Sequence, residues 1–178
     1  MNRIRVWCEF ASKTSVLGVS LLTATMLVAL VFPALPINGE LLDAKTGYSH
    51  SDAVTLMESY GESGRKVYAR SSLTLDTLLP VSYTFLLAGL IYRFRPSDGL
   101  WWLALLPAAG GVLDLFENVH VVLLLNSYPD VPAGLVARSS SLTWLKHHAL
   151  SISVVGAATL ASVSALVRIA GRLRGKTL

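Results

Sequence analysis

Four long apolar segments constrain the fold of this chain more than any other feature of its sequence. They run from Thr14 to Pro36, from about Ser72 to Phe94, from Leu100 to Leu125 and from Leu142 to Ile169. Each is long enough for an α-helix to cross the hydrocarbon core of a bilayer, which takes about 20 residues. Only 15% of the residues are charged, against about 25% in an average soluble protein. The segments predict an all-α integral membrane protein, folded as a four-helix antiparallel bundle in one domain over residues 1–178.

The first segment could instead be a signal peptide, because Arg3, Arg5 and Lys13 give it a basic start. Its apolar core is longer than the usual 7–15 residues or so, and no A-x-A-like cleavage site follows it. We therefore expect this segment to be retained as the first membrane span. Cys8, which precedes it, is the only cysteine of the chain, so neither an intrachain disulfide nor a cysteine-based metal site is expected.

The distribution of lysine and arginine predicts how the bundle is oriented. Nine of these residues lie on the side of the two termini: Arg3, Arg5, Lys13, Arg93, Arg95, Arg168, Arg172, Arg174 and Lys176. Five lie on the other side: Lys45, Arg65, Lys66, Arg70 and Arg138. The positive-inside rule then places both termini in the cytoplasm, and the small size and strong bias favour a bacterial inner membrane. Because the basic residues gather at segment ends, where the bilayer explains them, the net charge of +4 does not indicate a nucleic-acid partner.

The loop between the first two segments, residues 37–70, lies on the predicted outer side. Apolar residues recur in it at helical spacing, at Ala53, Leu56, Met57 and Tyr60, and this predicts a short amphipathic helix. Ser51 is the expected N-cap and Gly61 the expected end of this helix. We expect it to cover the outer mouth of the bundle. The basic residues that follow, including Arg70, would meet lipid phosphates or the buried polar residues, or would form a solvated rim.

Polar residues interrupt three of the apolar segments at a similar predicted depth, in the outer half of the membrane. Asp114, Glu117 and Asn118 share one face of the third segment. Asp76 and Tyr83 share a face of the second, and the fourth carries Lys146, His147 and His148 near its outer end. Each ionised group costs about 2.5–3.5 kcal/mol at a helix centre. These groups are therefore predicted to meet in an inward-facing cluster, where a proton or a cation offsets the excess of carboxylates over Lys146.

The two adjacent histidines of the fourth segment point about 100° apart, so only one of them can face the cluster. We expect that one to be His147, because its face continues through small or apolar residues at Ser151, Val154 and Ala158. The predicted site thus has Asp114, Glu117 and His147 as candidate catalytic groups. The candidate ligand-binding groups are Asp76, Tyr83, Asn118, Lys146 and Arg70.

Several functions are compatible with such a cluster. The first is a binding protein whose outward-facing site takes a cation, a lipid head group or a small amphiphile. The second is an intramembrane enzyme acting on a lipid-like substrate, with Asp114 or Glu117 as base and His147 as acid, or with these residues and Asp76 as metal ligands. The third is a structural or assembly subunit of a membrane complex, in which small-residue stripes of the third and fourth segments meet a partner membrane protein or, in a homo-oligomer, a second copy. In that case Lys146 merely pairs with Asp114 and Glu117. The sequence identifies no cofactor and no particular metal.

Overall fold

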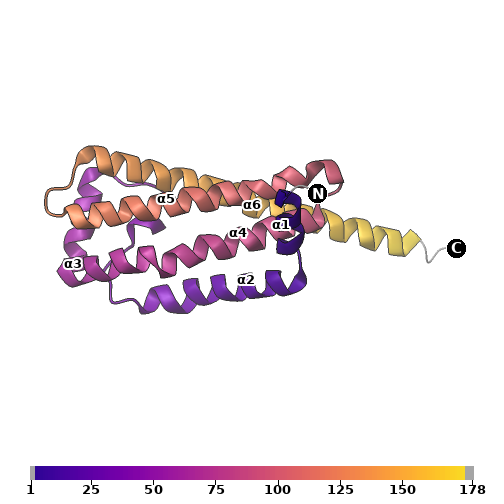
Figure 1. Cartoon of the computed structure of the whole chain (residues 1–178), viewed down its shortest axis with the longest axis horizontal. Helices are drawn as coiled ribbons and strands as arrows, with labels where there is room; N and C mark the ends of the chain where they lie inside the picture. The colour runs from indigo at the N-terminus through magenta and orange to yellow at the C-terminus, as the bar shows by residue number, and fades with distance from the viewer. Residues whose placement is uncertain (1–2, 175–178) are drawn as a thin grey trace.

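The computed structural model describes residues 3–174, with side chains as far as Gly171, and all regular secondary structure in this part of the chain is helical. Four helical stretches are long and apolar enough to cross a membrane: Thr14–Ala34, His50–Phe94, Asp98–Ser127 and Ala133–Gly171. They lie side by side in an elongated bundle (Figure 1). The predicted fold class, an all-α protein with four such stretches, is confirmed.

The N-terminal part of the chain forms a short helix and the first long apolar stretch. Helix α1 (Arg3–Ala11) lies across one end of the bundle, and α2 (Thr14–Met26) runs from there along α4 (Leu75–Phe94). The α2 stretch ends in a π-helical turn, η1 (Leu27–Val31), and a 3₁₀ turn, η2 (Phe32–Ala34). We call the end of the bundle at α1 the terminal end and the opposite end, at α3, the cap end (Figure 1).

The backbone of Ala11 packs directly on Gly89 of α4. A Cβ at position 89 would clash with the Ala11 carbonyl oxygen and would lie 2.7 Å from its carbon. We therefore expect Gly89→Ala to lower the free energy of unfolding by about 1–3 kcal/mol, as overpacking usually does. Gly156→Ala is the matched control, because no heavy atom lies within 4 Å of a Cβ there, and alanine favours a helix by about 1 kcal/mol. Unfolding in a detergent titration measures both, and equal shifts for the two variants would contradict the close approach.

The long loop after η2 contains a 3₁₀ turn, η3 (Leu42–Ala44), and leads into α3 (His50–Leu73), which forms the cap end. The predicted N-cap at Ser51 is wrong. Ser49 is the N-cap instead, because its hydroxyl accepts from the Asp52 backbone NH while the Asp52 carboxylate accepts from the Ser49 NH. At Gly61 the backbone is non-helical, with φ 64° and ψ 177°. The helix bends there, continues to Leu73 and is followed at once by α4, which starts at Leu75 rather than at Ser72.

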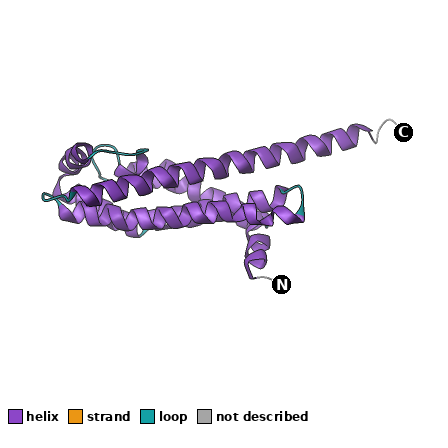
Figure 2. Cartoon of the chain, turned by 90° about the horizontal axis from the view of Figure 1, so that it is seen from above, coloured by secondary structure: helices purple, strands orange, loops and turns teal. Residues whose placement is uncertain are grey.

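The second half of the chain supplies the other two long stretches. After α4, the chain turns into the 3₁₀ helix η4 (Asp98–Leu105) and continues as α5 (Leu106–Ser127). Helix α6 (Ala133–Arg174) starts nine residues before the predicted Leu142, and it extends beyond the other helices at the terminal end (Figure 2). The side chains of Arg172 and Arg174, and the whole of Lys176, lie outside the described part of the structure.

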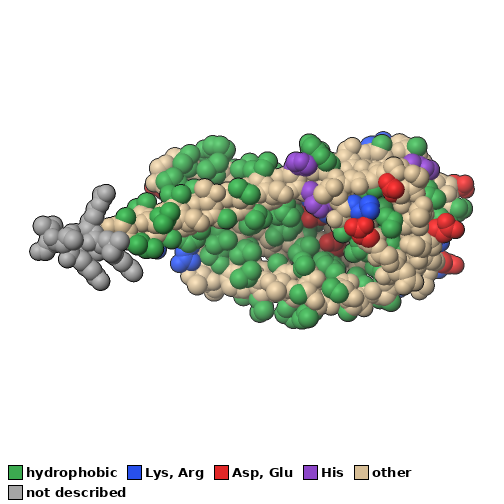
Figure 3. All heavy atoms as spheres, turned by 180° about the vertical axis from the view of Figure 1, so that it is seen from behind, with side chains coloured by type: hydrophobic (Ala, Val, Ile, Leu, Met, Phe, Trp, Pro, Cys, Tyr) green, Lys and Arg blue, Asp and Glu red, His purple; other side chains and the backbone are tan. Residues whose placement is uncertain are grey.

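Two hydrophobic cores fill the bundle, one near each end. The cap core joins η3, α3, α5 and α6 and contains Leu42, Tyr48, Ala53, Met57, Tyr60, Tyr68, Val121, Leu124, Leu125 and Val136. The terminal core joins α1, α4, η4 and α6 and contains Cys8, Tyr83, Leu87, Ala88, Ile91, Tyr92, Ala104 and Ala157. On the face shown in Figure 3, hydrophobic side chains are spread along the bundle, whereas most charged ones gather towards the cap end. The buried polar residues of α4, α5 and α6 lie between the two cores.

Candidate functional site

Lys146 of α6 forms a buried ion triad with two carboxylates of α5. Its Nζ lies 3.3 Å from Asp114 Oδ1 and also pairs with Glu117 Oε2. All three side chains are at least nine-tenths buried. The structure therefore brings together Asp114, Glu117 and Lys146, three of the residues that the sequence places in one cluster.

Hydroxyl groups complete the hydrogen bonding of the triad. The Tyr83 hydroxyl of α4 donates to Asp114 Oδ2 at 2.9 Å, and the Thr143 hydroxyl donates to Glu117 Oε1. One turn before Thr143, Ser139 Oγ accepts a 2.7 Å hydrogen bond from Tyr48. Burial raises the pKa of the Tyr48 phenol, so Tyr48 remains a neutral donor. Each triad carboxylate thus has a charged partner and a hydroxyl partner, which is how buried charges are tolerated.

A second pair of carboxyl groups lies beside the triad and has no cation of its own. Asp76 is only 7% exposed at the start of α4, and Asp43 reaches it from η3. Asp43 Oδ1 accepts a 2.6 Å hydrogen bond from Tyr68, but Asp76 Oδ2 has no donor among the described residues. Both carboxyl groups line the same cavity, so their negative charges would repel each other there if both were ionised.

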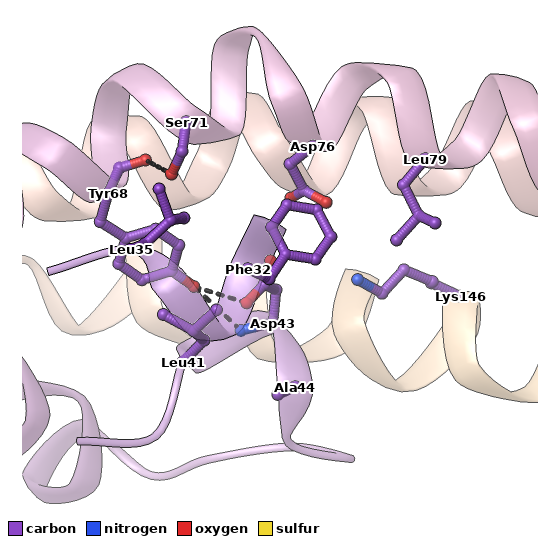
Figure 4. A pocket seen from close by; sticks show the side chains of 10 residues that line it. All are labelled: Phe32, Leu35, Leu41, Asp43, Ala44, Tyr68, Ser71, Asp76, Leu79 and Lys146. Carbon is purple, nitrogen blue, oxygen red and sulfur yellow. Dashed lines mark hydrogen bonds between the residues drawn. The ribbon is translucent and has the colours of Figure 1, made fainter. Parts of the chain in front are cut away.

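Both carboxyl groups of this second pair line a cavity of about 150 Å³, with Lys146 at its far side (Figure 4). We call it the acidic cavity. Most of its wall is apolar. It is lined by Phe32, Leu35, Leu41, Asp43, Ala44, Tyr68, Ser71, Asp76, Leu79 and Lys146. Its acidic groups are the carboxyl groups of Asp43 and Asp76, while Phe32, Leu35, Leu41 and Leu79 supply most of the apolar part.

The charges around the acidic cavity do not balance. Four carboxyl groups, those of Asp43, Asp76, Asp114 and Glu117, stand against the single ammonium of Lys146. If all were ionised, the cluster would carry three net negative charges. Lys146 is already engaged by the two carboxylates of the triad. No basic side chain of the described chain forms an ion pair with Asp43 or Asp76.

The prediction that His147 faces the cluster is wrong. Its ring is half-buried and its Nδ1 lies 2.9 Å from the backbone oxygen of Thr143, one turn earlier on the same helix. Ser151 and Val154, which continue its face, are exposed. The buried stripe of α6 instead passes through Lys146 and contains Val136, Ser139, Thr143, Ser153 and Ala157. The inward face of α6 is therefore offset by one residue from the expected face. The ring of His148 stacks on that of Trp144, with 3.9 Å between the two ring centres.

Two other predicted residues lie apart from the acidic cavity. Arg70 is exposed and takes part in none of the ion pairs found in the described chain. Asn118 is buried on the same face of α5 as Asp114, yet neither its amide nitrogen nor its oxygen has a hydrogen-bond partner among residues 3–174. Of the predicted ligand-binding residues, the structure thus places Asp76 and Lys146 at the cavity wall and Tyr83 one contact behind it.

Sequence reasoning missed Asp43. It lies in a loop, where no helical periodicity predicts the direction of a side chain. The available signal was its position after Leu41 and Leu42, two apolar residues in an otherwise polar stretch. Leu42 is fully buried in the cap core, and it fixes η3 so that Asp43 turns towards α4.

The described residues contain no group of three or more histidine, cysteine, aspartate or glutamate side chains arranged to hold a metal ion. What the arrangement offers is one pair of carboxyl groups in a small, mostly apolar cavity, next to an internally balanced triad. In comparisons with protein-family models, with curated proteins and with solved structures, none matches this chain.

Proposed function

We propose that this chain is a multi-pass protein of a bacterial inner membrane that binds a cation in the acidic cavity, from the outer side. The observation that carries this proposal is the Asp43–Asp76 pair. The buried carboxyl group of Asp76 and the half-buried one of Asp43 line a cavity whose one lysine, Lys146, is paired with the triad, and Asp76 Oδ2 has no donor in the described chain. A bound cation would supply both the charge and the hydrogen bonds that the protein leaves unmade.

The proposed orientation has the cap end outside and both termini in the cytoplasm. It rests on the excess of lysine and arginine on the side of the termini. At that end, the Arg5 guanidinium lies 5.4 Å from the centre of the Trp101 ring, and Arg93 donates to Thr14. Basic and aromatic residues such as Arg5 and Trp101 are typical of a membrane interface.

The depth of the cavity supports access from water. At 1.5 Å per residue, Phe32 lies about 27 Å along the helix axis from Thr14, close to the thickness of a hydrocarbon core, which is about 30 Å. Because Thr14 contacts Arg93 at the terminal end, the cavity that Phe32 lines lies near the opposite boundary. A cation could therefore enter from the outer side without crossing the membrane.

We assign the ion triad to the stability of the fold. Its two carboxylates are paired with Lys146 and hydrogen-bonded to Tyr83 and Thr143. The acid–base mechanism with His147 has no support in the geometry, since that ring bonds to its own helix. The triad is therefore the wall behind the binding site, and the Asp43–Asp76 pair is the site.

Asp76→Asn tests this proposal in purified protein. The wild-type melting temperature should rise with the concentration of a bound cation, because ligand binding stabilises the folded state. In the variant this response should be lost. Without added cation, the variant should be more stable than the wild type by about 1–3 kcal/mol, because an amide can donate to Asp43 and one unsatisfied buried group is removed.

Melting curves with potassium, magnesium, calcium and alkylammonium chlorides at constant ionic strength provide the measurement. Glu62→Gln is the matched control. Like Asp76→Asn, it removes one carboxylate near the cap end, but Glu62 lies on α3 and its side chain is 76% exposed. It should respond to cations as the wild type does. If no cation shifts the wild-type melting temperature, or if Asp76→Asn responds equally, the proposal is wrong.

A further inference from the structure

Resting on the proposed cation site, we infer that its ligand is a primary ammonium group carried on an apolar chain. The carboxyl groups of Asp43 and Asp76 offer acceptors to this ligand. The Tyr68 hydroxyl at the wall already donates to Asp43, and Asp76 Oδ2 lacks a donor among the described residues. A primary ammonium brings three N–H donors, whereas a quaternary ammonium brings none.

The walls of the acidic cavity disfavour a metal ion. Calcium takes six to eight oxygen ligands or so, and magnesium prefers an octahedral set. Here two carboxyl groups are surrounded by the side chains of Phe32, Leu35, Leu41 and Leu79. No third histidine, cysteine or acidic side chain in the described chain joins them as a metal-binding group. A metal ion would lose water ligands on several sides to apolar surface, whereas an alkylammonium loses water only around its ammonium group and brings an apolar chain that matches the walls.

The same apolar walls suit the carbon chain of an amine. Phe32 lines the cavity together with both carboxyl groups (Figure 4), so an ammonium held by the carboxyl groups would also meet an aromatic ring. Such a contact attracts a cation when it lies within about 6 Å of the ring centre. Lys146 approaches from the opposite side to Tyr68 (Figure 4), and its positive charge repels a second ammonium. The ligand's ammonium should therefore lie towards Asp43, with its chain along Phe32 and Leu35.

Two sources could provide this ammonium: a free amine from the outer aqueous phase, or the ethanolamine head group of a phospholipid. The wall at Phe32 and Leu35 belongs to the end of the α2 stretch, whose neighbouring residues Val28 and Leu30 are 57% and 62% exposed. An apolar chain could thus continue from the cavity towards lipid. The chemistry recognised at the carboxyl groups is the same for both sources.

Thermal melts in detergent with butylammonium, tetramethylammonium or calcium chloride at equal ionic strength test the ligand class. Butylammonium should raise the melting temperature in a saturable manner, and tetramethylammonium should need at least roughly tenfold higher concentrations, because it cannot donate a hydrogen bond. Phe32→Leu should weaken the butylammonium effect by about fivefold, the size of a lost cation–π contact. Asp76→Asn should abolish it, and Glu62→Gln should leave it unchanged.

Melts in nanodiscs distinguish the two sources. If a lipid supplies the ammonium, wild-type protein should melt higher in phosphatidylethanolamine than in phosphatidylcholine, and Asp76→Asn should remove that difference. If a free amine does, the two lipids should give equal melting temperatures, and butylammonium should raise both. Equal or stronger stabilisation by tetramethylammonium or calcium would overturn the ammonium assignment while leaving a cation site in place. The absence of any cation effect in the wild type would instead remove the site itself.

Discussion

Lys146→Met is expected to lower the free energy of unfolding by about 3–5 kcal/mol, the typical loss when one partner of a buried ion pair is removed. The substitution keeps an unbranched side chain of similar length but leaves Asp114 and Glu117 without their shared cation. Both carboxylates are almost completely buried, and only the hydroxyls of Tyr83 and Thr143 remain to them. Unfolding in a sodium dodecyl sulfate titration, followed by circular dichroism, measures the loss.

A neutral version of the triad separates charge from packing. Combining Lys146→Met with Asp114→Asn and Glu117→Gln should restore most of the lost stability, because no uncompensated charge is left. Lys66→Met is the matched control. Lys66 pairs with Glu62 one helical turn away, and 67% of the Lys66 side chain is exposed. This substitution should change the free energy of unfolding by less than about 0.5 kcal/mol. If the neutral triple variant is as unstable as Lys146→Met alone, lost packing rather than unpaired charge explains the effect.

Leu42→Ala should lower the free energy of unfolding by about 2–5 kcal/mol, the range for removing a large side chain from a packed core. Leu42 is fully buried in the cap core, where it joins residues of α3, α5 and α6. It is also the residue next to Asp43, so its loss should loosen η3 and displace one of the two carboxyl groups of the acidic cavity. Stability and cation response should therefore fall together.

Leu73→Ala controls for the loss of a leucine at the cap end, because Leu73 is 56% exposed at the end of α3. For both variants, the detergent titration measures the free energy of unfolding, and thermal melting at increasing cation concentration measures the cation response. A small and equal effect of the two substitutions would show that η3 is not held by the cap core. A large loss of stability at Leu42 with an unchanged cation response would instead separate the cap core from the binding site.

The overall architecture could be predicted because bilayer-length apolar segments leave a chain few alternatives. The convergence of Asp114, Glu117 and Lys146 also followed from the sequence, since buried charges need partners and helical periodicity limits where they point. Which face of α6 points into the bundle could not be predicted from the sequence. Small residues occur on several of its faces, so a choice between His147 and Lys146 amounts to a rotation of about 100°. Only the packing of α6 against α4 and α5 decides it.

At the start of α3, the local sequence contained the information needed to predict the N-cap correctly. Ser49 is followed three residues later by Asp52, the spacing of a capping box, and this favours Ser49 over Ser51 as the N-cap. Asp43 is a different case. The apolar pair Leu41 and Leu42 signals that this part of the loop is held by a core, but the direction of Asp43 depends on how Leu42 packs in the cap core, whose other members are distant in sequence. Since Asp43 completes the carboxyl pair, the acidic cavity emerges only from the tertiary structure.

A bromine-labelled amine decides whether the acidic cavity is a cation site. Crystals of the protein grown with 3-bromopropylammonium would show the bromine by its anomalous scattering. We predict one peak beside Phe32 and Leu35, with the ammonium density within hydrogen-bonding distance of Asp43 and Asp76, and no such peak in Asp76→Asn crystals. An empty cavity at saturating amine, or a bromine peak of equal height in the variant, would contradict the cation site.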